Sequence, residues 1–155
     1  MLERRYYVET SVWGMIPTGQ PREMRRASLQ FLRGFASSCY YISSVVRDEI
    51  GDCREPVLAQ ILKIMDEVAP TPLRATSEVF TLAQRYTEAG IIPAKKQEDA
   101  LHVALATVYH MDVLVSWNHR HIANIRKTEL YRAANLLHGY SQTPLILTPL
   151  EVLHV

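Results

Sequence analysis

Short apolar runs alternate with longer segments of helical periodicity along the whole of this 155-residue sequence. Residues 6–8 and 113–116 are runs of aromatic and β-branched side chains that favour buried strands, and residues 39–42 and 145–147 have the same character. Because parallel strands need crossover connections, this alternation predicts a sheet covered by helices. We therefore expect an α/β fold: a three-layer α/β/α sandwich with a short, mostly parallel central sheet, formed by residues 1–155 as a single domain.

Capping residues and the spacing of apolar side chains place the helices between these runs. Leu29, Leu32 and Phe35 recur at three-residue steps, Ser43 or Ser44 can cap a helix that contains Glu49, and residues 97–109 are rich in alanine. Pro70 and Pro72 end a helix, so no strand is predicted around them. The predicted helices cover residues 22–35, 45–50, 56–68, 76–90, 97–109 and about 124–138.

Composition excludes several classes of protein. The chain has 17 Lys plus Arg and 16 Asp plus Glu, for a formal charge of +1, which is not the charge of a broadly basic nucleic-acid coat. Cys39 and Cys53 are the two cysteines, too few for a disulfide framework or a Cys-rich zinc site. No apolar run approaches the ~20 residues that span a bilayer, and residues 1–11 lack an apolar stretch, so we expect no secretory signal. We expect a cytoplasmic protein that makes no membrane contact.

Four polar residues follow or lie near the ends of predicted strands. Glu9 follows the first strand, Glu49 lies in the helix after the second, Asp99 opens the alanine-rich helix, and Asn118 follows residues 113–116. Because sites in open parallel sheets form beyond the carboxyl ends of the strands, these side chains are expected to converge. Carboxylates that cluster raise each other's pKa unless a cation compensates them, and Mg²⁺ and Mn²⁺ prefer oxygen ligands. Phosphodiester hydrolysis suits such a site.

Each of these residues also has a purely structural interpretation. Glu9 alone is compatible with a solvated acid at a strand end, Glu49 with a hydrated helix face, and Asp99 with the positive end of a helix dipole. Asn118 is typical of a turn. His102, one turn after Asp99, is interpreted as a core histidine that hydrogen-bonds a neighbour.

Five stretches together resemble the PIN domain, the small ribonuclease fold that includes the VapC toxins of bacterial and archaeal toxin–antitoxin pairs. They are YYVETSVWG at 6–14, YISSVVRDEI at 41–50, EDALHVALA at 98–106, VLVSWNHRHIAN at 113–124 and TPLEVL at 148–153. The resemblance covers essentially the whole chain. It implies Mg²⁺- or Mn²⁺-dependent cleavage of RNA, a protein antitoxin as partner and a homodimer.

The resemblance also assigns roles to residues. The catalytic positions of the family correspond to Glu9, Glu49, Asp99 and Asn118, with Glu9, Asp99 and Glu49 as the metal ligands. Thr10 and Ser116 resemble the hydroxyls that support the first and fourth positions. Position 9 is Glu where Asp is usual, and position 118 is Asn where many members have Asp, so a weakened ribonuclease is expected.

Two other functions remain open at this point. A catalytically degenerate PIN-fold module that binds RNA or protein is one, and a phosphohydrolase that acts on small molecules at the same acidic edge is the other. The sequence contains neither a G-x-G-x-x-G nor a P-loop motif, which disfavours the use of a nucleotide cofactor.

Overall fold

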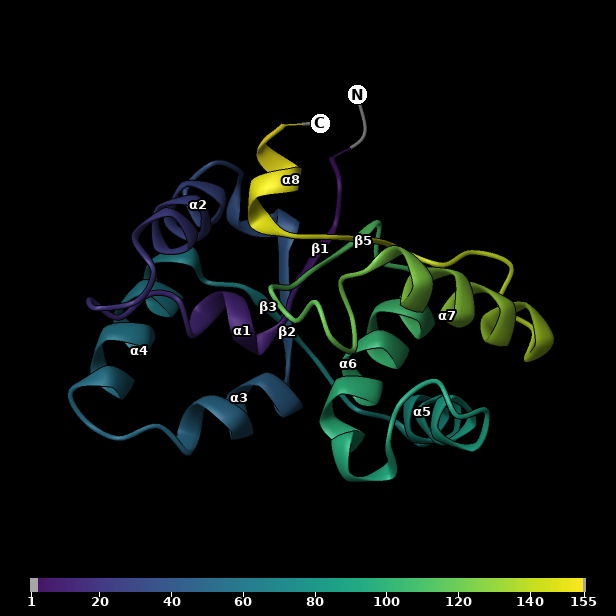
Figure 1. Cartoon of the computed structure of the whole chain (residues 1–155). Coiled ribbons are helices and arrows are strands. Elements are labelled where there is room, and N and C mark those ends of the chain that lie inside the picture. The colour runs from purple at the N-terminus through teal and green to yellow at the C-terminus, as the bar shows by residue number, and fades with distance from the viewer. Residues whose placement is uncertain (1–2, 155) are drawn as a thin grey trace.

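The computed structural model describes residues 3–154 and has a five-stranded sheet at its centre. All strand pairs are parallel and the order is β3-β2-β1-β4-β5 (Figure 1). The predicted α/β class is therefore confirmed, with a sheet that is wholly rather than mostly parallel. The strands are β1 (Tyr6–Val8), β2 (Tyr40–Ser43), β3 (Thr71–Leu73), β4 (Val113–Val115) and β5 (Leu145–Leu147).

Helices cover both faces of this sheet. Right-handed crossovers from β1 to β2 and on to β3 place their connecting helices on one face, and the crossovers that lead to β4 and β5 place theirs on the other. Figure 1 shows this division, with α1–α4 on one side of the strands and α5–α7 on the other. The helices are α1 (Thr10–Trp13), α2 (Arg22–Leu32), α3 (Ser44–Gly51), α4 (Val57–Val68), α5 (Ser77–Glu88), α6 (Gln97–Val108), α7 (Ile125–Leu137) and α8 (Pro149–Leu153).

Two expectations about local structure were wrong. Strand β3 forms although Pro72 lies in its middle, and it can do so because β3 is an edge strand, where the missing N–H of proline is tolerated. The second helix ends at Leu32, and Phe35 lies beyond it, 41% exposed. Gly34, a poor helix former, follows the helix end, and the Phe35 ring packs against Tyr6 instead.

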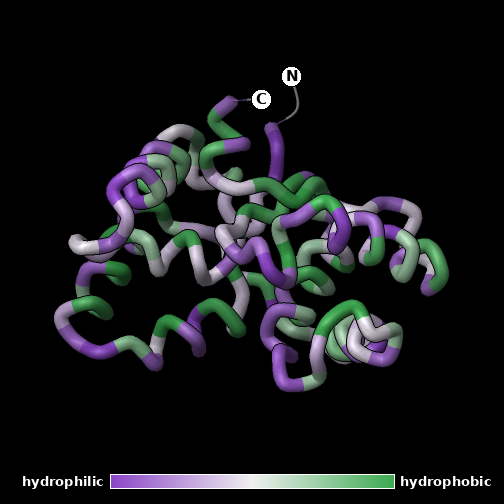
Figure 2. The backbone as a smooth tube through the Cα atoms, viewed as in Figure 1, coloured by the Kyte–Doolittle hydropathy of each residue, from purple (hydrophilic) through white to green (hydrophobic). Residues whose placement is uncertain are grey.

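The hydrophobic core lies between the sheet and the helices on both faces. In Figure 2 hydrophobic and hydrophilic residues alternate along the outer helices, as expected for helices with one buried face. Helix α6 differs, because every residue from 100 to 107 is buried. Within residues 3–154, none of the helices combines the length and the apolar character needed to cross a membrane.

Candidate functional site

The site lies between β1 and β4, where the order in which strands are added to the sheet reverses. From β1 the chain builds outward to β2 and β3, whereas β4 lies on the other side of β1 and leads to β5. Crevices at the carboxyl ends of strands form at such a switch point. Glu9 directly follows β1 and Ser116 directly follows β4, and Val8 and Val115 are paired in register, so the two residues lie side by side at this edge.

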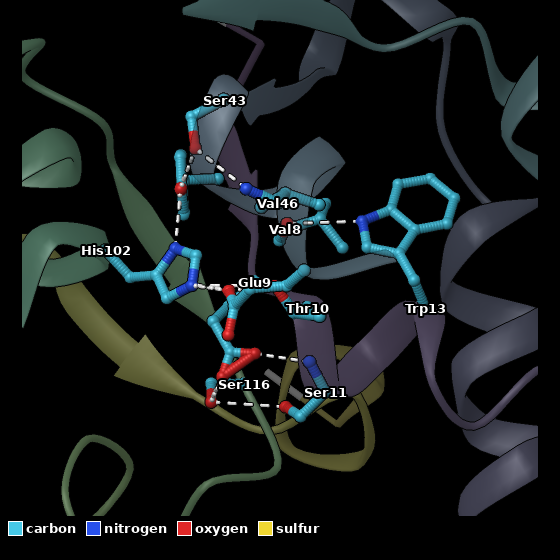
Figure 3. Close-up of polar contacts among 11 residues, drawn as sticks. Val8, Glu9, Thr10, Ser11, Trp13, Ser43, Val46, His102 and Ser116 are labelled. Atoms are coloured by element: carbon cyan, nitrogen blue, oxygen red, sulfur yellow. Dashed lines mark hydrogen bonds and ion pairs between the residues drawn. The ribbon is translucent and has the colours of Figure 1, made fainter. Parts of the chain in front are cut away.

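Glu9 is buried and fixed at both carboxylate oxygens. Only 3% of the residue is exposed. Its side chain caps α1 by accepting a hydrogen bond from the backbone N–H of Ser11, and its Oε1 accepts a second from Ser116 Oγ at 3.1 Å (Figure 3). The interpretation of Glu9 as a solvated strand-end acid is therefore wrong, because the chain turns into α1 directly after β1 and closes over the side chain.

Glu49 reaches the same edge from α3. Its Oε1 accepts hydrogen bonds from Thr10 Oγ1 at 2.7 Å and from His102 Nε2 at 2.6 Å. Because Thr10 is the residue after Glu9, it ties the end of β1 to α3. Among the described residues no protein group donates to Oε2 of Glu49, and 31% of the side chain is exposed, so this oxygen remains available.

A buried chain of hydrogen bonds leads from the core of the sheet to Glu49. His102, on α6, is 1% exposed, and its Nδ1 lies 2.8 Å from the hydroxyl of Tyr7. That hydroxyl lies 2.7 Å from Ser43 Oγ, which caps α3 (Figure 3). The prediction of a core histidine bonded to a neighbour is confirmed, and the neighbour on one side is a candidate site acid.

Burial and charge shift the pKa values of these groups in different directions. Burial raises the pKa of the Glu9 carboxyl, although the nearby His102 and the hydrogen bonds to Glu9 oppose it. Burial also acts to raise the pKa of Glu49, but the hydrogen bond and charge of His102 outweigh it, and the net pKa lies below the ordinary value. Desolvation lowers the pKa of His102, but its bond to Glu49 and the charges of Glu9, Glu49 and Asp99 raise it above 6.5 overall. The neighbouring acids thus favour the protonated form of the imidazole, which lies against Glu49.

The other two predicted site residues lie at the margin. Asp99 is half-buried in the first turn of α6 and acts on His102 through its charge. Asn118 organises the turn after β4: its Oδ1 accepts from the N–H of His121 at 3.0 Å, and its own N–H donates to Ser116 Oγ at 2.9 Å. The structure therefore forms two hydrogen-bonded groups at this edge, Glu9 with Ser11 and Ser116, and Glu49 with Thr10 and His102. Because Glu9 and Thr10 are adjacent in the chain, the two groups lie next to each other, and Asn118 has the role of a turn residue.

The donor set limits how a metal ion can bind. Within residues 3–154 no three His, Cys, Asp or Glu side chains converge closely enough to hold a metal ion, so the three-carboxylate ligand set is not assembled in this geometry. Mg²⁺, however, usually keeps several waters and takes one or two protein carboxylates. Glu49 has an available oxygen and Glu9 supplies a second carboxylate at the same edge. This donor set fits a largely hydrated Mg²⁺ or Mn²⁺ ion.

Sequence reasoning did not assign Tyr7, Ser43 or Ser11 to this group. Ser43 ends β2 and obeys the same strand-end rule as Glu9, so its position was a usable signal. Tyr7 lies inside an apolar strand, and nothing in the pattern of the strand indicates that its hydroxyl reaches His102. Ser11 contributes its backbone N–H to Glu9, and its hydroxyl accepts a hydrogen bond from the backbone N–H of Trp117 at 2.8 Å.

Comparison with known proteins shows the fold. No family model matches the sequence, and no curated protein matches it. Among solved structures, the chain is similar to the Mycobacterium tuberculosis toxin VapC20, described as a sarcin–ricin loop cleaving toxin. The two are 13% identical, the match covers 90% of this chain and 99% of VapC20, and the TM-score is 0.57. The fold is PIN-like.

Proposed function

We propose that this protein is an endoribonuclease that depends on Mg²⁺ or Mn²⁺ and acts as the toxin of a toxin–antitoxin pair. The observation that carries the proposal is that Glu9 and Glu49 lie at the switch point of a PIN-like sheet in two neighbouring hydrogen-bonded groups, and that the charges of both act on His102. The likeness to VapC20, a toxin described as cleaving an RNA loop, supports RNA as the substrate and a protein antitoxin as the partner.

Glu9 and Glu49 would hold the metal ion directly or through waters, and Asp99 would contribute charge from α6. When bound, such an ion lowers the pKa of water and neutralises charge that develops on the phosphate. The protein's own groups prepare the two carboxylates. Ser116 and the Ser11 amide hold Glu9, whereas Thr10 and His102 hold one oxygen of Glu49 and leave the other directed to ligands.

Charge balance supports this division of roles. Two carboxylates that share one edge of a sheet repel each other, and a protonated His102 would offset part of that repulsion before any ion binds. We therefore expect weaker metal binding than a cluster of three unpaired carboxylates would give, in agreement with a slow ribonuclease.

The test is cleavage of structured and single-stranded RNA with Mg²⁺, with Mn²⁺ and with a chelator. Glu49→Gln keeps the shape of the side chain but removes its charge, and we expect a loss of about a hundredfold or more in rate. Asp48→Asn is the matched control, because Asp48 is exposed and adjacent on the same helix. Asp99→Asn and Glu98→Gln form a second matched pair on α6.

Equal activity of wild type and Glu49→Gln would refute the assigned role of Glu49. RNA binding that persists without any cleavage under all metal conditions would favour a catalytically degenerate module. Hydrolysis of phosphomonoesters in preference to RNA would indicate a small-molecule phosphohydrolase instead.

A further inference from the structure

A groove beside the acidic edge has the lining of a small-ligand site. It has a volume of about 670 Å³ and lies between α7 and α8, along edge strand β5 (Figure 1). Three apolar side chains in its wall are open to solvent: Ile125 is 83% exposed, Leu145 54% and Leu150 50%. Pockets of this size with a largely apolar lining hold small organic groups, and exposed apolar side chains that gather in one place mark a binding surface.

Trp117 joins this groove to the acidic edge. It lines the groove, and it directly follows Ser116, whose hydroxyl donates to Glu9. The backbone N–H of Trp117 donates to Ser11 Oγ at 2.8 Å, and the backbone N–H of Ser11 donates to Glu9. The groove therefore begins one residue away from two groups that hold a candidate metal ligand.

The indole ring of Trp117 is held in a fixed orientation. Its Nε1 donates to Ser28 Oγ on α2 at 2.8 Å, and the residue is half-buried. A ring that is already fixed loses little conformational entropy when a flat group stacks on it. Unpaired RNA bases stack on aromatic side chains in this way, since every base has a π-face.

The charge around the groove suits a polyanion. Residues 118–132 have a formal charge of +3, whereas the whole chain has +1. The four basic residues of this segment are Arg120, Arg126, Lys127 and Arg132, and the one acid is Glu129. An apolar peptide against β5 would gain nothing from this excess of positive charge, which favours a nucleic acid as the occupant.

Two charged side chains in the groove lining can serve the polar parts of a nucleotide. Arg132 and Glu129 both line the groove, and within residues 3–154 neither makes an ion pair. The guanidinium of Arg132 can contact a phosphate without first leaving a carboxylate. The carboxylate of Glu129 can accept hydrogen bonds from the N–H groups at the edge of a base.

From these observations we propose that the groove is the subsite for one unpaired nucleobase of the RNA substrate, with the base stacked on Trp117 and its phosphate in contact with Arg132. The inference deepens the ribonuclease function proposed above and rests on it for the identity of the substrate. Trp117 binds the substrate and supplies no group to the chemical step.

Tryptophan fluorescence tests the proposal, because a base that stacks on an indole quenches its emission. The chain has two tryptophans, and Trp13 is fully buried, so a ligand reaches Trp117. In the presence of a chelator, we expect adenosine, guanosine, cytidine and uridine 5′-monophosphates to quench the emission. Ribose 5-phosphate, which has no base, should leave the emission unchanged.

Substitutions separate stacking from general attraction to phosphate. The affinity for the same nucleotides, measured by equilibrium dialysis, should fall about tenfold or more in Trp117→Leu and should be largely kept in Trp117→Phe, which retains a ring. Tyr140→Leu is the matched control, because Tyr140 is a half-buried aromatic residue in a different cavity.

A second matched pair on α7 tests the groove without changing a packed side chain. Arg132→Gln and Arg126→Gln each remove one exposed positive charge from the same helix, but only Arg132 lines the groove. We therefore expect Arg132→Gln to weaken nucleotide binding and Arg126→Gln to change it little. This pair decides the proposal even if Trp117→Leu fails to fold, which circular dichroism checks for every variant.

Three results would overturn the inference. They are equal quenching by ribose 5-phosphate and by nucleotides, equal nucleotide affinity of wild type and folded Trp117→Leu, and equal effects of the two arginine substitutions. An emission that changes with protein concentration but not with nucleotides would assign the groove to a second copy of the chain and would also overturn it.

The titrations contain no metal ion, so they decide the base subsite separately from cleavage. Base-dependent binding without RNA cleavage under any metal condition would refute the ribonuclease proposal and leave the subsite in place. Cleavage of RNA without base-dependent binding would refute the subsite alone.

Discussion

The contact between His102 and Glu49 gives a prediction that a double-mutant cycle can measure. His102→Asn retains a group that can bond the Tyr7 hydroxyl but is too short to reach Glu49, and Glu49→Gln removes the charge with little change in shape. The two atoms are 2.6 Å apart, His102 is 1% exposed and the Glu49 side chain is 31% exposed. Hydrogen bonds to charged groups contribute about 1.5–3 kcal/mol, and the exposure of Glu49 argues for the lower part of that range. We expect a coupling free energy of about 2 kcal/mol near pH 6.

The pH dependence follows from the directions of the two pKa shifts. The pKa of His102 is raised from 6.5 in the folded state. The contribution of His102 to stability is therefore complete below pH 6.5 and is lost as the pH rises through the folded-state pKa. The pKa of Glu49 is lowered from 4.5 in the folded state. The contribution of Glu49 to stability is therefore present above pH 4.5 and is lost as the pH falls through the folded-state pKa. The coupling should therefore be greatest between these limits and smaller at alkaline pH.

Urea denaturation of the four proteins, followed by circular dichroism near pH 6 and near pH 9, measures the coupling. A second cycle that pairs His102→Asn with Asp48→Asn is the control and should give a coupling near zero, because Asp48 is exposed on the same helix. A His102–Glu49 coupling below about 0.5 kcal/mol near pH 6, or one that grows toward pH 9, would refute the assignment of an internal ion pair.

Three further substitutions test other parts of the structure by the free energy of unfolding. Ser116→Ala removes the side-chain donor to Glu9 and should cost about 1–2 kcal/mol; no loss would mean that this bond contributes little. Thr148→Ala removes both the cap and the capping box of α8 and should cost about 1 kcal/mol, unless that short helix is held by packing alone. Asn135→Ala leaves the buried Tyr86 hydroxyl without its 2.5 Å acceptor and should cost about 3 kcal/mol, whereas a loss below about 1 kcal/mol would contradict the inferred role of this bond.

Much of the architecture follows from local sequence signals. The strands at 6–8 and 145–147 and the alanine-rich helix have strong patterns, and the structure has them within a residue or two of the predicted bounds. Strand β3 could not be predicted, because Pro72 argues against a strand and only its place at the edge of the sheet makes the strand permissible. Whether a strand lies at the edge depends on the strand order of the whole sheet, which the local sequence does not show.

The site was predictable in position but not in its contacts. The strand-end rule brings Glu9 to the carboxyl edge of the sheet, and α3 brings Glu49 to the same edge. The sequence does not reveal that His102 bonds Glu49, because that contact depends on how α6 packs across the sheet against α3. The oxygen of Asn118, by contrast, is used in a local contact within its own turn, which the turn preference of asparagine makes predictable.

Glu9 both starts α1 and lines the acidic edge, and this double use has a practical consequence. Any species that draws the carboxylate toward itself must loosen its hold on the Ser11 amide. Hydrogen–deuterium exchange at that single amide would then report occupancy of the pocket, even for ligands that are never turned over. Exchange of the Ser11 amide in α1 would thus serve as a probe of ligand binding at this edge of the sheet.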